Sequence, residues 1–395
     1  MEKVIKTNMD LSIVIPLYNH EKYIEECLTS ILVGFDENDE IIVIDDGSTD
    51  NSVAVVERMI KEHGNIRLIE NGVNKGCAFS IATGINEAKG KYIGVSNSDD
   101  YVDPGYYAKM LKVAKSTKAD IVCASIAMVF GKQIYRTDIL KENVVPDIPK
   151  KYFSKVSPFK ISGDILLGHA SASSASTKII LKKWYLKYPF IGTKANDLPS
   201  IYPILAEAEN IVFCPNLYMY YRQVDNSLSK RDDFASYASV ADSIVDTLKL
   251  LDEVKDEKYK EILLANNFLD FLCYVVPEIK DEKTRVGVIE HSIKTLLSYD
   301  KNVFQKMNKS KYTELFKDKN GVEYTKVLFQ LLCNLDIDAV DLLIRLEGQN
   351  RRFSDRIIVL ENHIENLAAE NEGYKNSMSW KITAPLRSIK RTIKR

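Results

Sequence analysis

The sequence has 395 residues, 45% of them hydrophobic, which is enough for a large core and two or three structural units. A formal net charge of −1 gives no global basic field, so no nucleic acid is expected as a partner. The six cysteines are scattered without a CxxC pair, which argues against a zinc site or a disulfide framework and favours a reducing compartment. Pro16 interrupts the first apolar run, and no run approaches the roughly 20 apolar residues of a membrane span. We therefore expect a soluble, cytoplasmic protein body.

Strands and helices alternate through the first hundred residues. The predicted strands are Leu11–Pro16, Glu40–Ile44, Ile66–Ile69 and Tyr92–Val95. Amphipathic helices are predicted between them, and the strands are continuous apolar runs of the kind found in sheets that are covered on both faces. This alternation predicts an α/β fold with a Rossmann-like, mostly parallel, right-handed sheet.

Candidate ligand-binding residues stand at or just after the ends of three of these strands. They are Pro16, Tyr18 and Asn19 at the first strand, Asp45, Asp46 and Ser48 at the second, and Asn97, Asp99 and Asp100 at the fourth. Ligands of open α/β sheets bind just beyond the carboxyl ends of the strands. Adjacent carboxylates at that edge suit a hard divalent cation that carries phosphates. The alternative is a solvated turn in which Asp99 and Asp100 only cap the next helix.

Two common nucleotide-binding motifs are missing. The chain has neither GxGxxG nor GxxxxGK[ST], which argues against a dinucleotide oxidoreductase and a P-loop NTPase. Phosphate charge would then be neutralised by a cation, while a tyrosine ring stacks on a base and a carboxylate accepts from a base or ribose.

Four motifs occur in an order and spacing that resemble the inverting family 2 glycosyltransferases of GT-A fold. They are Ile15–Asn19, Asp45–Asp50, Asn74–Gly76 and Ser98–Asp100, and the resemblance covers roughly residues 10–230. It implies a nucleotide-diphosphate-sugar donor, with uracil as the base by family habit, and Mn²⁺ or Mg²⁺. By motif position, Tyr18 and Asp46 would hold the base, Asp99 would lie near the ribose and sugar, and Asp99 and Asp100 would serve the metal.

The resemblance also implies further donor contacts, and the chain departs from the family at three positions. The donor-binding set includes Pro16, Asn19, Asp45, Ser48, Lys75, Asn97 and Arg222, the last of which precedes a loop that resembles one closing on the diphosphate. Arg222 is equally compatible with an ordinary surface arginine. Asn97 replaces the usual first acid of the metal motif, and Ile81 and Ala82 replace a usual Arg-Asn pair. Donor recognition would therefore differ from the common pattern.

Asp197 precedes a predicted helix in the acceptor half. The family usually has Glu-Asp here, and Asn196-Asp197 retains the second acid, so the resemblance makes Asp197 the candidate general base. A base on the face opposite the leaving diphosphate fits direct displacement with inversion. The alternative is a carboxylate that only favours the helix dipole. The small-residue loop Gly168–Ser176 is either an acceptor approach or a connector, and the lone His169 in it is more typical of a structural residue.

The last third of the chain is predicted to be helical. We expect a catalytic domain over residues 1–232, a helical domain over 233–340, a coiled coil over 341–372 and a basic amphipathic tail over 373–395. Apolar residues spaced for a coiled-coil seam of about three to four heptads are Leu343, Leu346, Phe353, Ile357, Leu360, Ile364 and Leu367, with Asn350 among them. Self-association as a homo-oligomer is expected, and one helix lying on its own domain is the alternative.

The tail carries Trp380 and spaced isoleucines among basic residues, a pattern typical of contact with an anionic membrane surface. Residues 379–387 also resemble an ending found on many bacterial polysaccharide glycosyltransferases. We therefore expect a cytoplasmic protein that is peripheral at the inner face of the cell membrane. A disordered basic tail is the alternative.

Together these features predict an inverting glycosyltransferase that moves a sugar from a nucleotide-diphosphate donor to a glycan or lipid-linked acceptor of the bacterial surface. A nucleotidyltransferase would usually show a Gly-rich basic loop after the first strand, which Pro16–Asn19 is not. A non-catalytic nucleotide-sugar-binding scaffold acting through the coiled coil would be consistent with Asn97, Ile81 and Ala82. The retention of both Asp100 and Asp197 argues against it.

Overall fold

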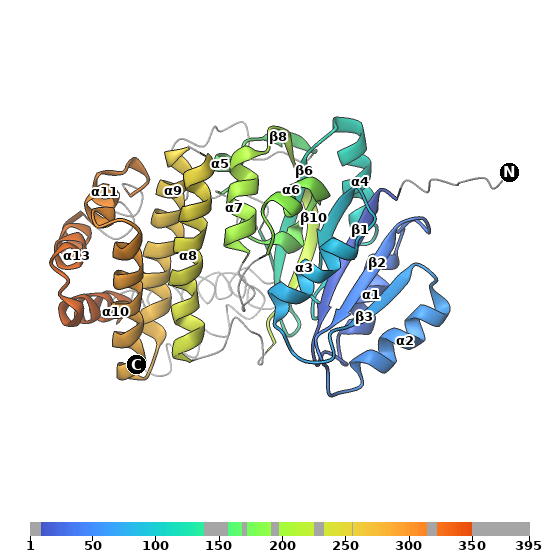
Figure 1. Cartoon of the computed structure of the whole chain (residues 1–395), viewed down its shortest axis with the longest axis horizontal. Coiled ribbons are helices and arrows are strands. Elements are labelled where there is room, and N and C mark those ends of the chain that lie inside the picture. The colour runs from blue at the N-terminus through green and yellow to red at the C-terminus, as the bar shows by residue number, and fades with distance from the viewer. Residues whose placement is uncertain are drawn as a thin grey trace, which may run out of the picture. The chain divides into compact units, whose positions relative to one another are not determined.

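The computed structural model describes residues 9–137, 157–167, 172–190, 197–224, 233–254, 256–313 and 322–349. The chain divides into two compact units, residues 1–337 and 338–395. Within the described part, the first unit is built on one ten-stranded sheet with the order β3-β2-β1-β4-β9-β6-β10-β5, while β7 pairs with β6 and β8 with β10. The strands are β1 Leu11–Leu17, β2 Glu40–Asp45, β3 Ile66–Glu70, β4 Tyr92–Val95, β5 Tyr101–Val102, β6 Ile121–Phe130, β7 Gln133–Thr137, β8 Phe159–Ile161, β9 Lys178–Leu181 and β10 Ile211–Arg222 (Figure 1).

Helices cover both faces of the sheet. They are α1 Ile24–Leu32, α2 Ser52–Glu62, α3 Cys77–Glu87, α4 Tyr106–Thr117, α5 Gly163–Leu166, α6 Lys182–Lys187 and α7 Leu198–Glu207. Helices α1, α2 and α4 share a core with Ile13, Ile15 and Val43 on one face. Helix α3 packs on the other face, where a Cβ on its Gly84 would lie 2.4 Å from Val14 Cγ1. Two covered faces explain why the strands are apolar on both sides.

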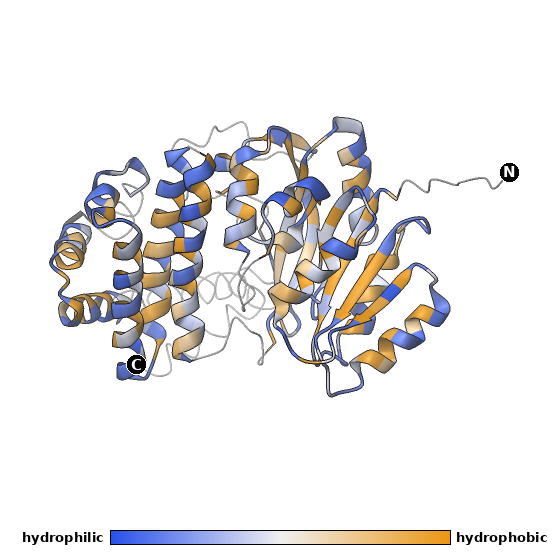
Figure 2. Ribbon diagram, viewed as in Figure 1, coloured by the Kyte–Doolittle hydropathy of each residue, from blue (hydrophilic) through white to orange (hydrophobic). Residues whose placement is uncertain are grey.

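The parallel part of the sheet follows the prediction. All residues of β1 and β2 are buried, and Figure 2 shows these strands as hydrophobic. Strand β1 pairs in parallel with both β2 and β4, and β2 pairs in parallel with β3. Ser12 and Glu40 are polar exceptions that satisfy each other, because Ser12 Oγ donates to Glu40 Oε1 at 2.8 Å.

The second half of the sheet is mixed and less predictable. Strand β9 lies antiparallel between β4 and β6, and its four residues are too short a run to stand out by period. Strand β10 is long and irregular, and its register against β6 shifts between Cys214 and Tyr218. Pro215 lies inside this irregularity and Asn216 has a φ of 57°. A proline cannot donate to a ladder, so its position in sequence resembles a strand end.

A helical region follows β10, as predicted. Its helices are α8 Phe234–Val254, α9 Glu257–Leu263, α10 Glu282–Tyr299, α11 Val303–Lys309 and α13 Val322–Asn334. Helix α8 packs against both α7 and α10, which joins this region to the sheet layer. In the described segments we find no helix with the length and apolar character needed to cross a membrane.

The predicted coiled coil is not confirmed. Residues 337–349 are helical, and Leu346 at its predicted seam is 50% exposed. Leu343, the other seam position in this helix, is partly buried, and the seam positions from Asn350 onward and the basic tail lie outside the described residues.

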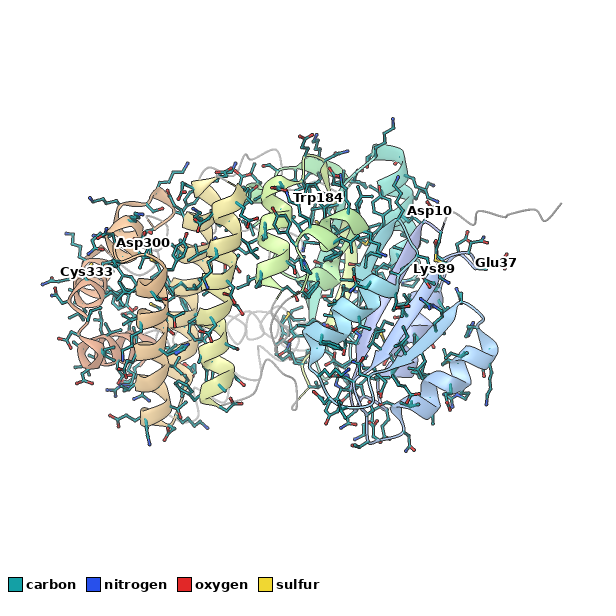
Figure 3. All side chains as sticks on the ribbon, viewed as in Figure 1. Asp10, Glu37, Lys89, Trp184, Asp300 and Cys333 are labelled. Atoms are coloured by element: carbon teal, nitrogen blue, oxygen red, sulfur yellow. The ribbon has the colours of Figure 1, made fainter. Side chains whose placement is uncertain are left out.

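Gly90 lies closely against the amino end of β1, and its substitution tests this packing. A Cβ on Gly90 would lie 2.4 Å from the backbone nitrogen of Ser12, and Figure 3 shows the adjacent Lys89 and Asp10 at this amino end of β1. We expect Gly90→Ala to lower the free energy of unfolding by about 1–3 kcal/mol, because backbone must move to admit the methyl group. Urea denaturation would measure the loss. Gly64→Ala is the control, since a Cβ there meets nothing within 4 Å, and equal losses in the two variants would contradict the prediction.

Candidate active site

The carboxyl ends of three neighbouring strands form one edge of the sheet. Leu17 of β1 pairs with Asp45 of β2, and Val14 of β1 pairs with Val95 of β4. The loops that follow these strands therefore leave the sheet side by side, as the sequence predicted. Pro16 lies beyond the last β1–β4 pair, where its missing N–H leaves no ladder bond unmade on that side.

The first two loops are tied together through Asn19 and Ser48. The backbone N–H of Asn19 donates to Ser48 Oγ at 3.0 Å, and the N–H of Thr49 donates to Asn19 Oδ1 at 2.7 Å. Asn19 takes a left-handed φ of 54°, a conformation that asparagine tolerates better than most residues. These bonds hold the loop that carries Tyr18, whose side chain is 40% exposed. A ring held at the surface in this way is available to stack on a planar ligand.

Asp45 and Asp46 organise the second and third loops. Asp45 accepts from the N–H groups of Gly47 at 3.0 Å and Ser48 at 3.1 Å, which closes its own turn. Asp46 accepts from the N–H of Lys75 at 2.9 Å and of Gly76 at 2.8 Å. The amide of Asn71 donates a third bond to Asp46 at 3.0 Å. Asp46 thus anchors the loop that places the exposed Lys75 side chain beside the ring of Phe79.

Asp99 and Asp100 form a buried acid pair. Their exposed fractions are 7% and 1%. Asp100 Oδ1 accepts from the backbone N–H of Arg222 at 2.8 Å, and its Oδ2 accepts from the amide of Asn97 at 2.8 Å. Burial, followed by repulsion from Asp99, raises the pKa of Asp100 to about 8. Burial also raises the pKa of Asp99, while His20 and Arg222 oppose that rise.

Asn97 lies next to this acid pair, at the position where the family usually has a third acid, and its role differs from that of an acid. Its amide is a neutral donor to Asp100, and it stabilises the charged form of that carboxylate. An aspartate at position 97 would add a third negative charge beside two that are already poorly compensated. The departure from the family pattern therefore changes the electrostatics of the pair rather than removing it.

The described residues contain no group of three or more His, Cys, Asp or Glu side chains arranged to hold a metal ion. The acid pair by itself nevertheless suits a divalent cation, because burial raises the pKa values of Asp99 and Asp100 and a bound cation would favour their ionised forms. Mg²⁺ is commonly held by one or two carboxylates and completes its shell with substrate phosphates and water.

The side chain of Arg222 lies between two aromatic rings. Its Cζ atom is 5.1 Å from the ring centroid of Tyr23 and 4.9 Å from that of Tyr101. Its Nη2 pairs with Glu26 Oε2 at 2.9 Å. In this structure the guanidinium thus contacts α1, and the backbone rather than the side chain of Arg222 bonds to the acid pair. The residues after 224 up to 232, including the predicted closing loop, lie outside the described part.

Asp197 is a further candidate residue, and it lies outside the three strand-end loops. It is the N-cap of α7, and its Oδ2 accepts from the backbone N–H of Ala175 at 2.7 Å. Burial raises the pKa of Asp197. Burial likewise raises the pKa of the Cys77 thiol to about 12, and the carboxylates of Asp197, Asp46 and Asp99 add to that rise. The charges of acids from three separate segments thus act on Cys77.

Sequence reasoning missed three residues of this site. His20 Nδ1 lies 2.7 Å from Ser98 Oγ, which links the loops after β1 and β4. Cys77 begins α3 among the three acids, and Lys178 is fully buried at the start of β9. Of the three, only Lys178 could have been found from the sequence. It begins the apolar run Ile179–Leu181 and falls on the same strand face as Ile180, so the pattern predicts a buried lysine. His169 and residues 168–171 of the small-residue loop are outside the described residues.

Known proteins are similar to this chain in sequence and in fold. Residues 12–175 match the family model of glycosyl transferase family 2. This segment of the chain is similar to the glycosyltransferases of family 2. The matched segment contains the three strand-end loops and the acid pair, and Asp197 lies beyond it.

Curated relatives are bacterial glycosyltransferases. The chain is 28% identical over 222 residues to glycosyltransferase GlyG of Streptococcus pneumoniae, covering 54% of this chain and 71% of GlyG. It is 27% identical to the poly(ribitol-phosphate) beta-glucosyltransferase of Bacillus spizizenii, covering 66% of this chain but 40% of that protein. It is 34% identical to EpsJ of Bacillus subtilis, covering 35% of this chain and 41% of EpsJ. The chain thus spans less than half the length of the two Bacillus relatives.

A solved structure shares the fold over most of the chain. TarS 1–349 of S. aureus, determined in complex with UDP-GlcNAc, superposes with a TM-score of 0.61 at 18% identity. The match covers 88% of this chain and 92% of that one. The predicted GT-A-like sheet and the helical region that follows it are therefore confirmed as a fold.

The raised pKa of Asp100 predicts how stability depends on pH without divalent cations. The folded state keeps this proton up to about pH 8, whereas an unfolded aspartate releases it near about pH 4. The folded state thus binds more protons across this window, so the free energy of unfolding falls as pH rises. We expect Asp100→Asn to show a smaller fall in melting temperature between pH 5 and pH 8 than the native protein.

Thermal unfolding in EDTA at the two pH values would measure this effect. Asp36→Asn is the control, because hydrogen bonds from Asn38 lower the pKa of Asp36 and its titration ends below the window. An Asp100→Asn variant with the native pH dependence would contradict the assignment.

Proposed function

We propose that this chain transfers a sugar, with inversion, from a nucleotide-diphosphate-sugar to a glycan or lipid-linked acceptor in cell-surface polysaccharide synthesis. Carboxylates from three separate segments, Asp46, Asp99 and Asp197, all act electrostatically on Cys77, and this shared neighbour carries the proposal. Such an arrangement puts donor-side and acceptor-side carboxylates within one site. The names of the relatives and the UDP-GlcNAc complex of TarS support a UDP-sugar donor and a surface-polymer acceptor.

The donor is proposed to lie along the strand-end loops. Tyr18 would stack on the base, and the loops that Asp45 and Asp46 hold would contact the nucleoside. Asp99 and Asp100 would hold Mn²⁺ or Mg²⁺, which neutralises charge on the leaving diphosphate. Both carboxylates are buried, so the low local polarity would strengthen their attraction to the cation. Lys75 is exposed beside these loops and provides a further positive charge.

Asp197 is proposed to be the general base. It accepts the proton of the acceptor hydroxyl as that oxygen attacks the anomeric carbon, and the bond to the diphosphate oxygen breaks on the opposite face. Burial raises the pKa of Asp197 and so brings its basicity closer to neutral pH. The bond from the Ala175 N–H occupies Oδ2 and leaves Oδ1 for the acceptor.

The setting of the enzyme is part of the proposal. We infer a cytoplasmic protein, peripheral at the inner face of the membrane through its basic tail and oligomeric through its coiled coil. These features rest on the sequence patterns described above. A lipid-linked acceptor at that surface would account for a tail with tryptophan and spaced isoleucines.

Nucleotide binding tests the donor site. We expect UDP with Mn²⁺ to raise the stability of the purified protein, by about 2.7 kcal/mol at 100 times its Kd, because ligand that binds only the folded state stabilises it by mass action. Thermal unfolding against UDP, GDP, ADP and CDP, each with Mn²⁺ or EDTA, would measure this. Asp100→Asn should lose the Mn²⁺-dependent part. Absence of any shift across the panel would refute the enzyme hypothesis and favour a scaffold.

Removal of the base tests the catalytic step. We expect Asp197→Asn to lower the turnover of sugar transfer, or of UDP-sugar hydrolysis where no acceptor is found, by about 10²–10⁴-fold. The UDP-dependent rise in melting temperature should remain. Glu209→Gln, an exposed carboxylate after the same helix, is the matched control and should keep native turnover. Native turnover in Asp197→Asn would remove this residue from the mechanism.

A further inference from the structure

Lys178 is a fully buried lysine near the candidate active site. It is 0% exposed and begins β9, where it pairs with Cys123 of β6. Because β9 runs antiparallel to β4 and Ile179 pairs with Gly94, Lys178 lies beside the carboxyl end of β4. That end leads into the loop that carries the acid pair. A buried ammonium is costly unless it is paired and hydrogen-bonded, so its neighbours matter.

The ammonium of Lys178 bonds to a short turn formed by the preceding residues. Its Nζ donates to the backbone carbonyl of Ser174 at 2.5 Å and to Thr177 Oγ1 at 3.1 Å. Residues Ala175–Thr177 form a single 3₁₀ turn that precedes β9. The lysine thus binds back onto the segment that leads into its own strand.

The same turn also binds Asp197. The N–H of Ala175 donates to Asp197 Oδ2 at 2.7 Å. The carbonyl of Ser174 and the N–H of Ala175 belong to one peptide group, so the positive charge of Lys178 and the negative charge of Asp197 bind its two ends. A donor on the carbonyl polarises the peptide and makes its N–H a stronger donor, because hydrogen bonds in a chain reinforce each other.

Among the described residues, a few titratable groups lie electrostatically close to this link. Asp197 faces Lys178 from β9, the thiol of Cys77 from α3 and the phenol of Tyr185 from α6. Lys178 also faces Cys123 of β6. Burial raises the pKa of Cys77 to about 12 and of Cys123 to about 11, and places the pKa of Tyr185 well above its usual range. All three are neutral near pH 7, which leaves Lys178 as the counter-charge among these groups.

We propose that Lys178 is a positioning residue that orients Asp197 and keeps it ionised through the Ser174–Ala175 peptide group. The inference rests on the proposed function for the role of Asp197 as a base, while the link between the two residues is a property of the fold itself. Burial lowers the pKa of Lys178 and raises that of Asp197, and each charge opposes the shift of the other. A lysine that served only as packing would leave the titration of Asp197 unchanged.

The titration of Asp197 tests the link without a substrate. Carbon-13 NMR of the aspartate carboxyl carbons, with the Asp197 signal identified by its loss in Asp197→Asn, would report its pKa. We expect Lys178→Met to raise that pKa by about one unit or more, since an opposite charge nearby favours the ionised carboxylate. Lys178→Arg should stay near native, because it keeps the charge. An unchanged Asp197 titration in Lys178→Met would overturn the proposal.

A matched lysine separates this effect from the general loss of a charge. Lys182 lies four residues after Lys178 in the chain. Its Nζ donates to the backbone carbonyls of Ala88 at 2.7 Å and Asn86 at 3.3 Å. Lys182→Met should therefore leave the Asp197 titration unchanged. The acid limb of the pH–rate profile for UDP-sugar hydrolysis should shift upward in Lys178→Met alone, with a loss in turnover at pH 6 rather than a rise in KM.

A reciprocal measurement covers the case in which the Lys178 variants do not fold. In Asp197→Asn the pKa of Lys178, followed at its Cε carbon, should fall because linkage between two sites is mutual. An unchanged Lys178 titration would overturn the proposal. UDP binding in the same samples distinguishes the two hypotheses. Coupled titrations without UDP binding would refute the proposed function only, and UDP binding with uncoupled titrations would refute the role of Lys178 only.

Discussion

The carboxylates at the ends of β2 and β4 are buried and accept hydrogen bonds from backbone N–H groups, and the site depends on this burial. Asp46 accepts three hydrogen bonds from the 71–76 loop, and Asp100 accepts two from Asn97 and Arg222. The same acids therefore fold the loops and define the charge of the site. Buried carboxylates that keep part of their charge uncompensated are unfavourable for folding and favourable for binding a cation.

On the acceptor side, a backbone hydrogen bond holds the candidate base in place. Asp197 begins α7, and its carboxylate accepts from the turn before β9 instead of capping its own helix. The antiparallel strand β9 brings this turn next to β4. One short strand thus sets the distance between the donor-side acids and the candidate base. Its buried lysine supplies positive charge in a part of the site that is otherwise acidic.

The scaffold alternative loses much of its support in this geometry. Asn97, which differs from the family pattern, donates to Asp100 and does not leave a gap in the site. Ile81, another departure, is 2% exposed and packs as a core residue of α3. Arg222 remains with Glu26 between Tyr23 and Tyr101. A contact between Arg222 and phosphate would require its guanidinium to move from between the rings of Tyr23 and Tyr101.

The sequence by itself determined the parallel strands, the three strand-end loops and the acids they carry, because continuous apolar runs followed by short polar turns are local patterns. It also marked Asp197 through a family motif. Only the tertiary structure decided what those acids contact, since Asp46 meets Lys75 and Gly76 across 29 and 30 residues, and Asp100 meets Arg222 across 122. The antiparallel placement of β9, the single bent strand β10 and the peptide shared by Lys178 and Asp197 are likewise set by packing. Such contacts join segments far apart in the chain, and no local period in the sequence encodes them.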